Sequence, residues 1–76
     1  MELNENRIGV LLADDAAIIR RAVIHLLEEE PRVRVLGEAE NLSQAVNLAM
    51  TLKPDVVLLD LHMPDDHEFE PAFVKS

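Results

Sequence analysis

Cysteine is absent from this chain of 76 residues, and so are tryptophan and tyrosine. Without cysteine there is no disulfide framework and no thiolate zinc site, and a reducing cytoplasm fits best. Only two glycines and four prolines occur, which excludes collagen-like and low-complexity proteins. No uninterrupted apolar run is longer than the one at residues 56–59, which is far too short to span a membrane.

Positive charge is also scarce. Seven Lys and Arg residues stand against fifteen Asp and Glu residues, so the formal net charge is −8. Nonspecific nucleic-acid binding needs a cationic surface, so this chain is not expected to bind nucleic acid directly. Hydrophobic residues make up 49% of the sequence, which is too many for a disordered tail. The length suits one small domain, so we expect residues 1–76 to form a single acidic cytoplasmic domain.

The spacing of apolar residues predicts alternating strands and helices. Residues 7–13 form a short apolar run that ends at an acidic pair, which is typical of a buried strand. Residues 16–30 repeat apolar side chains every three or four positions, so they should form an amphipathic helix that ends before Pro31. Residues 32–37 alternate polar and apolar side chains, as a half-covered or edge strand does.

A second helix and a third strand follow. Asn41 and Gln44 have the spacing of a capping box, so a helix should begin at Asn41 and end before Pro54. Residues 55–60 contain four successive apolar side chains, which predicts a strand covered on both faces. Strands separated by single helices run parallel and are joined by right-handed crossovers. The pattern therefore predicts an α/β fold, the βαβαβ portion of a doubly wound parallel sheet with strand order 2-1-3.

Residues 61–76 are less regular, although Pro71 could open a third helix. A three-stranded sheet whose most hydrophobic strand lies at an edge is a poor end point, because an unpaired edge invites further pairing. The sequence therefore resembles the front part of a larger domain. The same third-strand edge could instead support self-association of two copies.

Acidic residues follow two strands of the predicted sheet. Asp14 and Asp15 end the first strand and Asp60 ends the third. With strand order 2-1-3 these two strands are neighbours, and their carboxyl ends flank the switch point where such folds bind ligands. Asp14 and Asp15 alone could equally be helix caps, but a third Asp from an adjacent strand is hard to explain in that way. Carboxylates that converge favour a bound cation, and hard oxygen ligands suit Mg²⁺.

Three blocks of sequence together resemble a known family. They are residues 11–15 (Leu-Leu-Ala-Asp-Asp), 35–39 (Val-Leu-Gly-Glu-Ala) and 53–64 (Lys-Pro-Asp-Val-Val-Leu-Leu-Asp-Leu-His-Met-Pro). The blocks and their spacing resemble the response-regulator receiver domain of two-component systems, in the NarL/FixJ-like branch. The resemblance covers about residues 7–70 and implies a flavodoxin/CheY-like fold.

The resemblance implies a role for each acidic residue. Asp60 matches the phosphoacceptor, which takes a phosphoryl group from the phosphohistidine of a histidine kinase, the implied partner. Asp14 and Asp15 match the pair that holds Mg²⁺, with Asp15 as the direct ligand, and the backbone carbonyl of His62 matches the remaining protein ligand. These roles are chemically consistent, because a carboxylate is a nucleophile and Mg²⁺ offsets charge on the phosphoryl oxygens.

The sequence departs from the family's pattern at two points. His67 and Glu68 stand where the family usually has Asp-Gly, so the loop after the third strand loses a permissive glycine. The family also places a Ser or Thr after a fourth strand and a Lys after a fifth, and neither segment is present. The resemblance therefore implies that residues 1–76 are an incomplete receiver-type domain, in which the fourth and fifth strands and the following helices are missing. A receiver that ends at Ser76 is therefore expected to lack the switch even if it keeps the acceptor.

Two other functions stay open. An aspartyl-phosphate phosphohydrolase needs a second Asp two residues after its nucleophile, where this chain has His62, so a signalling phosphoacceptor is favoured over a turnover enzyme. A receiver-like interaction or assembly module would keep the acidic crevice without using it.

Arg20 and Arg21 are expected to solvate the first helix rather than bind phosphate.

Overall fold

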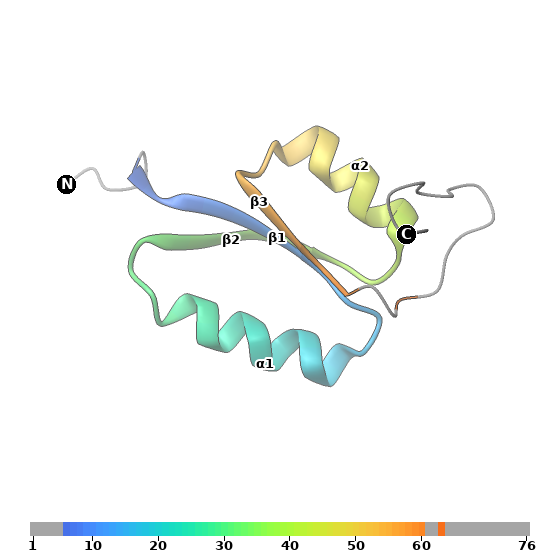
Figure 1. The fold of residues 1–76 in the computed structure, drawn as a ribbon, viewed down its shortest axis with the longest axis horizontal. Coiled ribbons are helices and arrows are strands. Elements are labelled where there is room, and N and C mark those ends of the chain that lie inside the picture. The colour runs from blue at the N-terminus through green and yellow to red at the C-terminus, as the bar shows by residue number, and fades with distance from the viewer. Residues whose placement is uncertain (1–5, 61–62, 64–76) are drawn as a thin grey trace, which may run out of the picture.

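The computed structural model describes residues 6–60 and 63, which form a parallel sheet with one helix on each face (Figure 1). The elements are β1 (Ile8–Ala13), α1 (Ala17–Glu28), β2 (Val33–Ala39), α2 (Leu42–Leu52) and β3 (Val56–Leu59). Their kinds and their order are those that the hydrophobic spacing predicts. In the part of the chain described, neither helix has the length and apolar character needed to cross a membrane.

Strand β1 lies at the centre of the sheet, between β2 and β3. It pairs in parallel with β2 along its whole length and with β3 from Val10 to Ala13. The register with β2 shifts between Val10 and Leu11, so that Leu36 is passed over by the pairing. The predicted strand order 2-1-3 is confirmed, and the strand ends that precede Asp14 and Asp60 therefore lie next to each other.

The buried core is built around β1 and the face that α2 covers. Leu11 and Ala13 are fully buried on the central strand. Helix α2 adds Leu42 and Ala45 to the core, whereas no residue of α1 is buried. The buried apolar residues are Val10, Leu11, Leu12, Ala13, Ala39, Leu42, Ala45 and Met63. Stability therefore depends chiefly on β1 and on the packing of α2 against β1 and β2.

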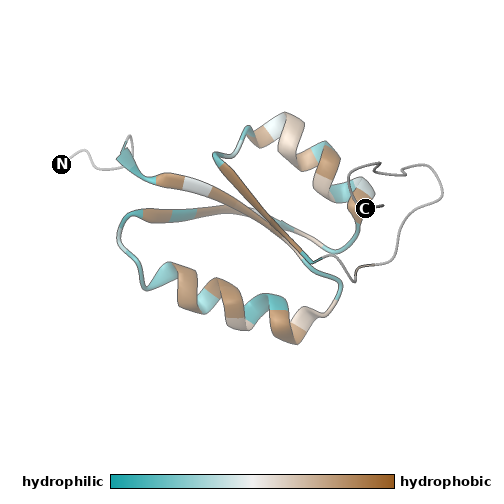
Figure 2. Ribbon diagram, viewed as in Figure 1, coloured by the Kyte–Doolittle hydropathy of each residue, from teal (hydrophilic) through white to brown (hydrophobic). Residues whose placement is uncertain are grey.

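Strand β3 is more exposed than its sequence predicts. Val56 and Val57 are each 41% exposed and Leu58 is 38% exposed, and Figure 2 shows the strand as hydrophobic along its length. The prediction of a strand covered on both faces is therefore wrong for the described residues. Within those residues β3 pairs only with β1, and both helices pack mainly against β1 and β2.

Helix α2 begins at its predicted cap. The Asn41 side chain accepts a hydrogen bond from the Gln44 N–H at 2.8 Å, which is one half of a capping box. The Gln44 side chain accepts from the Glu40 N–H at 3.0 Å, one residue before the expected partner. The helix ends at Leu52, and the C-cap residue Lys53 has a left-handed backbone (φ 53°) directly before Pro54. The predicted end before Pro54 is therefore confirmed.

Helix α1 begins without a capping side chain, and this leads to a stability prediction. Ala16 occupies the N-cap position with an extended backbone and no side-chain cap bond. Serine at that position can accept a hydrogen bond from the first turn, so Ala16→Ser should raise the free energy of unfolding by about 1 kcal/mol. Urea denaturation measures the change. Ala17→Ser, one residue later inside the helix, is the control, and an equal effect of both substitutions would refute the capping explanation.

Candidate functional site

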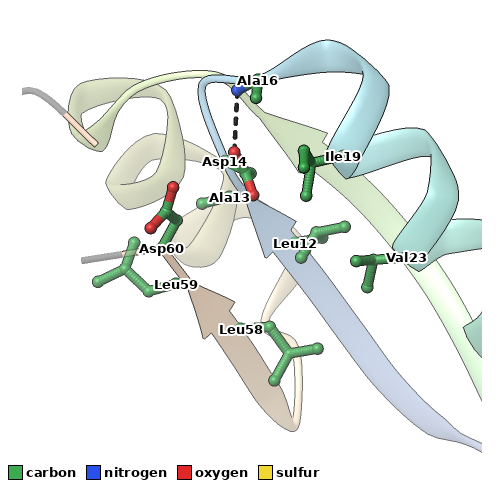
Figure 3. Close-up of a pocket in the computed structure, with 9 residues that line it drawn as sticks. All are labelled: Leu12, Ala13, Asp14, Ala16, Ile19, Val23, Leu58, Leu59 and Asp60. Carbon is green, nitrogen blue, oxygen red and sulfur yellow. Dashed lines mark hydrogen bonds between the residues drawn. The ribbon is translucent and has the colours of Figure 1, made fainter. Parts of the chain in front are cut away.

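Three aspartates meet at the carboxyl ends of β1 and β3. Asp14 and Asp15 directly follow β1, and Asp60 directly follows β3. One carboxylate oxygen from each residue lies within 4.8 Å of the corresponding oxygens of the other two. Figure 3 shows Asp14 and Asp60 at the adjacent strand ends. The structure thus brings together all three acidic residues that the sequence singles out.

Main-chain hydrogen bonds fix the two strand ends relative to each other. The Asp60 N–H donates to the Ala13 carbonyl at 3.0 Å, and the Asp14 N–H donates to the Ala39 carbonyl at 3.0 Å. The Met63 N–H donates to the Asp60 carbonyl at 3.1 Å. The bonds from Asp60 to Ala13 and from Asp14 to Ala39 extend the strand pairing by one residue, so both aspartate backbones are held by the sheet.

The three carboxylates differ in their access to solvent. Asp14 is buried, Asp60 is half-buried and Asp15 is exposed. The Asp14 Oδ1 accepts a hydrogen bond from the Ala16 N–H at 2.9 Å (Figure 3). This bond ties the Asp14 side chain to the start of α1, as Asp side chains commonly do in turns. Asp14 is therefore the anchored member of the cluster, and Asp15 is the one most open to a ligand from solvent.

A cleft of about 520 Å³ lies beside the aspartates. Figure 3 shows its lining side chains, which are Leu12, Ala13, Asp14, Ala16, Ile19, Val23, Leu58, Leu59 and Asp60. Most of this lining is apolar, with the Asp14 and Asp60 carboxylates at the end where the strands finish. The volume lies within the range of small-ligand sites, about 300–1,000 Å³. The arrangement can therefore hold a small polar group at the acidic end of the cleft.

The donor set fits a hard divalent cation. All three side chains offer carboxylate oxygens, which Mg²⁺ prefers to nitrogen or sulfur ligands. Because Mg–O distances are about 2.1 Å, ligand oxygens can lie up to about 4.2 Å apart across the ion. The cluster, with its oxygens within 4.8 Å, needs only small side-chain rotations to reach that spacing. A cation at this point would also offset the repulsion among three close carboxylates.

Arg20 is the residue near the site that sequence reasoning misplaces. Its Nη1 donates to the Asp14 carbonyl at 2.6 Å, and its Nε donates to the Glu38 carboxylate at 2.7 Å. The Arg20 side chain is 13% exposed, whereas that of Arg21 is 71% exposed. The expectation that both arginines solvate the first helix is therefore wrong for Arg20. The sequence feature that could have predicted this burial is Glu38, an acidic residue near the end of β2 that can pair with an arginine in the first turn of α1.

One candidate ligand and two sequence features fall outside the described residues. His62, whose backbone carbonyl the family resemblance implies as a Mg²⁺ ligand, is one of the residues that the structure leaves out. The departure at His67 and Glu68 and the helix expected at Pro71 also lie outside them. The described geometry therefore concerns Asp14, Asp15 and Asp60 alone.

Comparison with known protein families identifies the family of this chain. The family described as the response regulator receiver domain matches residues 10–70, most of the sequence. The chain belongs to the response-regulator receiver family. The resemblance predicted from the three sequence blocks is thus confirmed. Receiver domains act in two-component signalling, where they interact with histidine kinases and phosphotransfer partners.

Two kinds of curated protein show the similarity. A protein-glutamate methylesterase/protein-glutamine glutaminase of Halalkalibacterium halodurans is 45% identical over 60 residues, which cover 79% of this receiver chain and 17% of that protein. The nitrate/nitrite response regulator protein NarL of Escherichia coli K12 is 43% identical over 61 residues, which cover 80% of this chain and 28% of NarL. The receiver chain thus spans less than a third of the length of either relative.

Solved structures show the same fold. The signal receiver domain of the response regulator NarL from Mycobacterium tuberculosis has a TM-score of 0.75 and 36% identity, covering 78% of this chain and 48% of that one. A second structure is RcsB from Salmonella enterica serovar Typhimurium, bound to the promoter rprA in the presence of the phosphomimetic BeF3−. It has a TM-score of 0.75 and 34% identity, and the match covers 80% of this chain and 30% of the RcsB chain. The predicted CheY-like receiver fold is therefore confirmed.

Proposed function

We propose that this receiver accepts a phosphoryl group on Asp60 and holds Mg²⁺ with Asp14 and Asp15. The observation that supports this most strongly is the meeting of the three carboxylates, within 4.8 Å, at the ends of adjacent strands. The phosphohistidine of a histidine kinase is the proposed donor, since receiver domains interact with such kinases. The backbone carbonyl of His62 and the carboxylate of Asp60 are included in the proposed ligand set.

In this proposal Asp60 is the nucleophile. One of its carboxylate oxygens forms a bond to phosphorus as the P–N bond of phosphohistidine breaks, and the electron pair of that bond stays with the imidazole. When bound, Mg²⁺ offsets negative charge on the phosphoryl oxygens. The bond from the Asp60 N–H to the Ala13 carbonyl, at 3.0 Å, fixes the backbone from which the carboxylate reaches the cleft.

Asp14 and Asp15 have different parts in holding the cation. Asp14 is buried, and its Oδ1 is tied to the Ala16 N–H, so it supplies negative charge at a fixed position. Asp15 is exposed, so its carboxylate can turn toward an ion that arrives from solvent. We therefore assign the direct bond to Asp15 and the anchoring of the turn to Asp14.

The assignment of the direct bond to Asp15 predicts a loss of affinity when its charge is removed. Asp15→Asn should weaken Mg²⁺ binding about tenfold, because it removes one charge from the proposed ligand set. A tenfold change corresponds to about 1.4 kcal/mol. The chain has no Trp or Tyr to report binding by fluorescence, so an NMR titration that follows backbone amide shifts is the suitable measurement. Glu28→Gln, at the far end of α1, is a control that changes the net charge equally. Equal affinities of the two variants would argue against a role for Asp15.

A second candidate function is an interaction or assembly module that uses no phosphorylation. It is favoured by the exposed apolar residues of β3, which pairs only with β1 among the described residues. Such an edge can pair with the same edge of a second copy about a twofold axis. Light scattering separates the candidates, since this module requires a mass well above the 8.5 kDa of one chain and no phosphoryl uptake.

A further inference from the structure

We propose that Arg20 is a positioning residue of the cation site. It holds the turn between β1 and α1, which carries Asp14 and Asp15, in the conformation that binds the ion. Arg20 reaches the backbone carbonyl of Asp14 and not its carboxylate, so it acts through the turn. The inference rests on the proposed function of this site and adds a residue that governs its affinity.

Arg20 joins three elements of the fold. It lies in the first turn of α1, and it donates at 2.6 Å to the carbonyl of Asp14, directly after β1. It also donates at 2.7 Å to the carboxylate of Glu38, on β2. The guanidinium is a rigid planar group with several N–H donors, so one side chain can link both partners in a fixed geometry. A single side chain thus links the Asp14 turn to both α1 and β2.

The burial of Arg20 distinguishes it from an ordinary surface arginine. Its side chain is 13% exposed on a helix that has no buried residue. Exposed ion pairs contribute little to stability, whereas charge-assisted hydrogen bonds that are shielded from water are stronger. Arg21 approaches the same Glu38 carboxylate only at 3.8 Å and is largely in solvent. The two neighbouring arginines therefore form a natural pair of test and control.

The turn at Asp14 is held at three points. Its N–H donates to the Ala39 carbonyl at 3.0 Å, its Oδ1 accepts from the Ala16 N–H at 2.9 Å, and its carbonyl accepts from Arg20. Ala16 has no side chain that can cap α1, so the Arg20 bond provides a link across the helix start. Loss of this link leaves the Asp14 carbonyl able to rotate, and the carboxylates of Asp14 and Asp15 move with that peptide segment.

Charge and positioning predict effects of opposite sign, which makes the proposal testable. A positive guanidinium close to a cation site repels the cation. If Arg20 acted on the ion only through its charge, its removal would strengthen Mg²⁺ binding. If Arg20 positions the turn, its removal weakens Mg²⁺ binding. Arg20→Lys keeps the charge but loses the planar fork, so only the positioning role predicts weaker binding in that variant.

The experiment is an NMR titration of the 76-residue chain with Mg²⁺, in the wild type and in Arg20→Ala, Arg20→Lys and Arg21→Ala. We expect both Arg20 variants to bind Mg²⁺ about tenfold more weakly, as is common when a residue that orients metal ligands is lost. Arg21→Ala removes the same charge at the next position, and its affinity should stay within about twofold of wild type. A purely structural role would lower the urea midpoint without changing the affinity of the folded protein.

The possible results separate the inference from the proposed function. If the wild type binds Mg²⁺ and both Arg20 variants bind it as tightly or more tightly, the positioning role is overturned and the proposed function stands. If the wild type does not bind Mg²⁺, the proposed function fails and the inference fails with it. Should Arg20→Ala not fold, Arg20→Lys and Glu38→Gln decide, because unchanged affinity in these two variants overturns the role of the Arg20–Glu38 link.

Discussion

Replacing Asp60 with asparagine should abolish phosphoryl uptake and leave the fold intact. Asparagine is nearly the same size as aspartate, but its neutral amide lacks the nucleophilic carboxylate that forms the acyl phosphate. The hydrogen bond from the residue 60 N–H to the Ala13 carbonyl involves only the main chain, so β3 should remain paired with β1. Incorporation of a labelled phosphoryl group from a small-molecule phosphodonor, with Mg²⁺ present, measures the effect.

Asp55→Asn is the matched control for this substitution. Asp55 precedes β3 at its opposite end, and its carboxylate accepts a hydrogen bond from the Gly9 N–H at 2.7 Å. The carbonyl oxygen of an asparagine can accept the same bond. We therefore expect Asp55→Asn to retain phosphoryl uptake. Uptake by Asp60→Asn at the wild-type level would place the acceptor at another residue.

Replacing Leu11 with alanine should cause the largest loss of stability of any substitution considered. Leu11 is fully buried on the central strand and lies between its pairing partners Gly37 on β2 and Val57 on β3. Truncation of a buried leucine removes apolar contacts and leaves a cavity, which together cost about 2–5 kcal/mol. Small domains have a total stability of about 5–15 kcal/mol. The expected loss is therefore a large part of the whole.

Urea denaturation followed by circular dichroism measures the effect of Leu11→Ala. Ile18→Ala is the control, because Ile18 is 84% exposed on α1 and surface substitutions usually change stability by less than about 0.5 kcal/mol. The midpoint should fall sharply for Leu11→Ala and hardly at all for Ile18→Ala. Similar midpoints for the two variants would show that β1 does not carry the core.

Hydrophobic spacing predicted every described element because each has a local pattern in the sequence. The ends of the elements depend on partners and were predicted less well. Helix α1 covers Ala17–Glu28, whereas its pattern suggested residues 16–30. Strand β2 continues to Ala39, two residues beyond the alternating segment, because Ala39 pairs with Ala13 of β1. Such pairing joins residues far apart in the sequence, so no local pattern encodes it.

The candidate site, too, was predicted from the sequence only in part. The meeting of Asp14, Asp15 and Asp60 followed from the sequence, because parallel strands that neighbour each other end at the same edge of a sheet. The burial of Arg20 did not follow, since it depends on how α1 lies against the Asp14 turn and Glu38. The exposure of β3 was not predicted either. An apolar run shows that burial of a strand would be favourable, but it does not show that another element packs against the strand.

Phosphoryl transfer to Asp60 is tested most directly by the intact mass of the folded protein after incubation with a small-molecule phosphodonor. The incubation is done once with Mg²⁺ and once with a chelator that removes divalent cations. An acceptor at Asp60 served by a cation at Asp14 and Asp15 predicts a gain of one phosphoryl group with Mg²⁺ and none with the chelator. No gain in mass with Mg²⁺ would contradict the acceptor role and favour the interaction module built on the β3 edge.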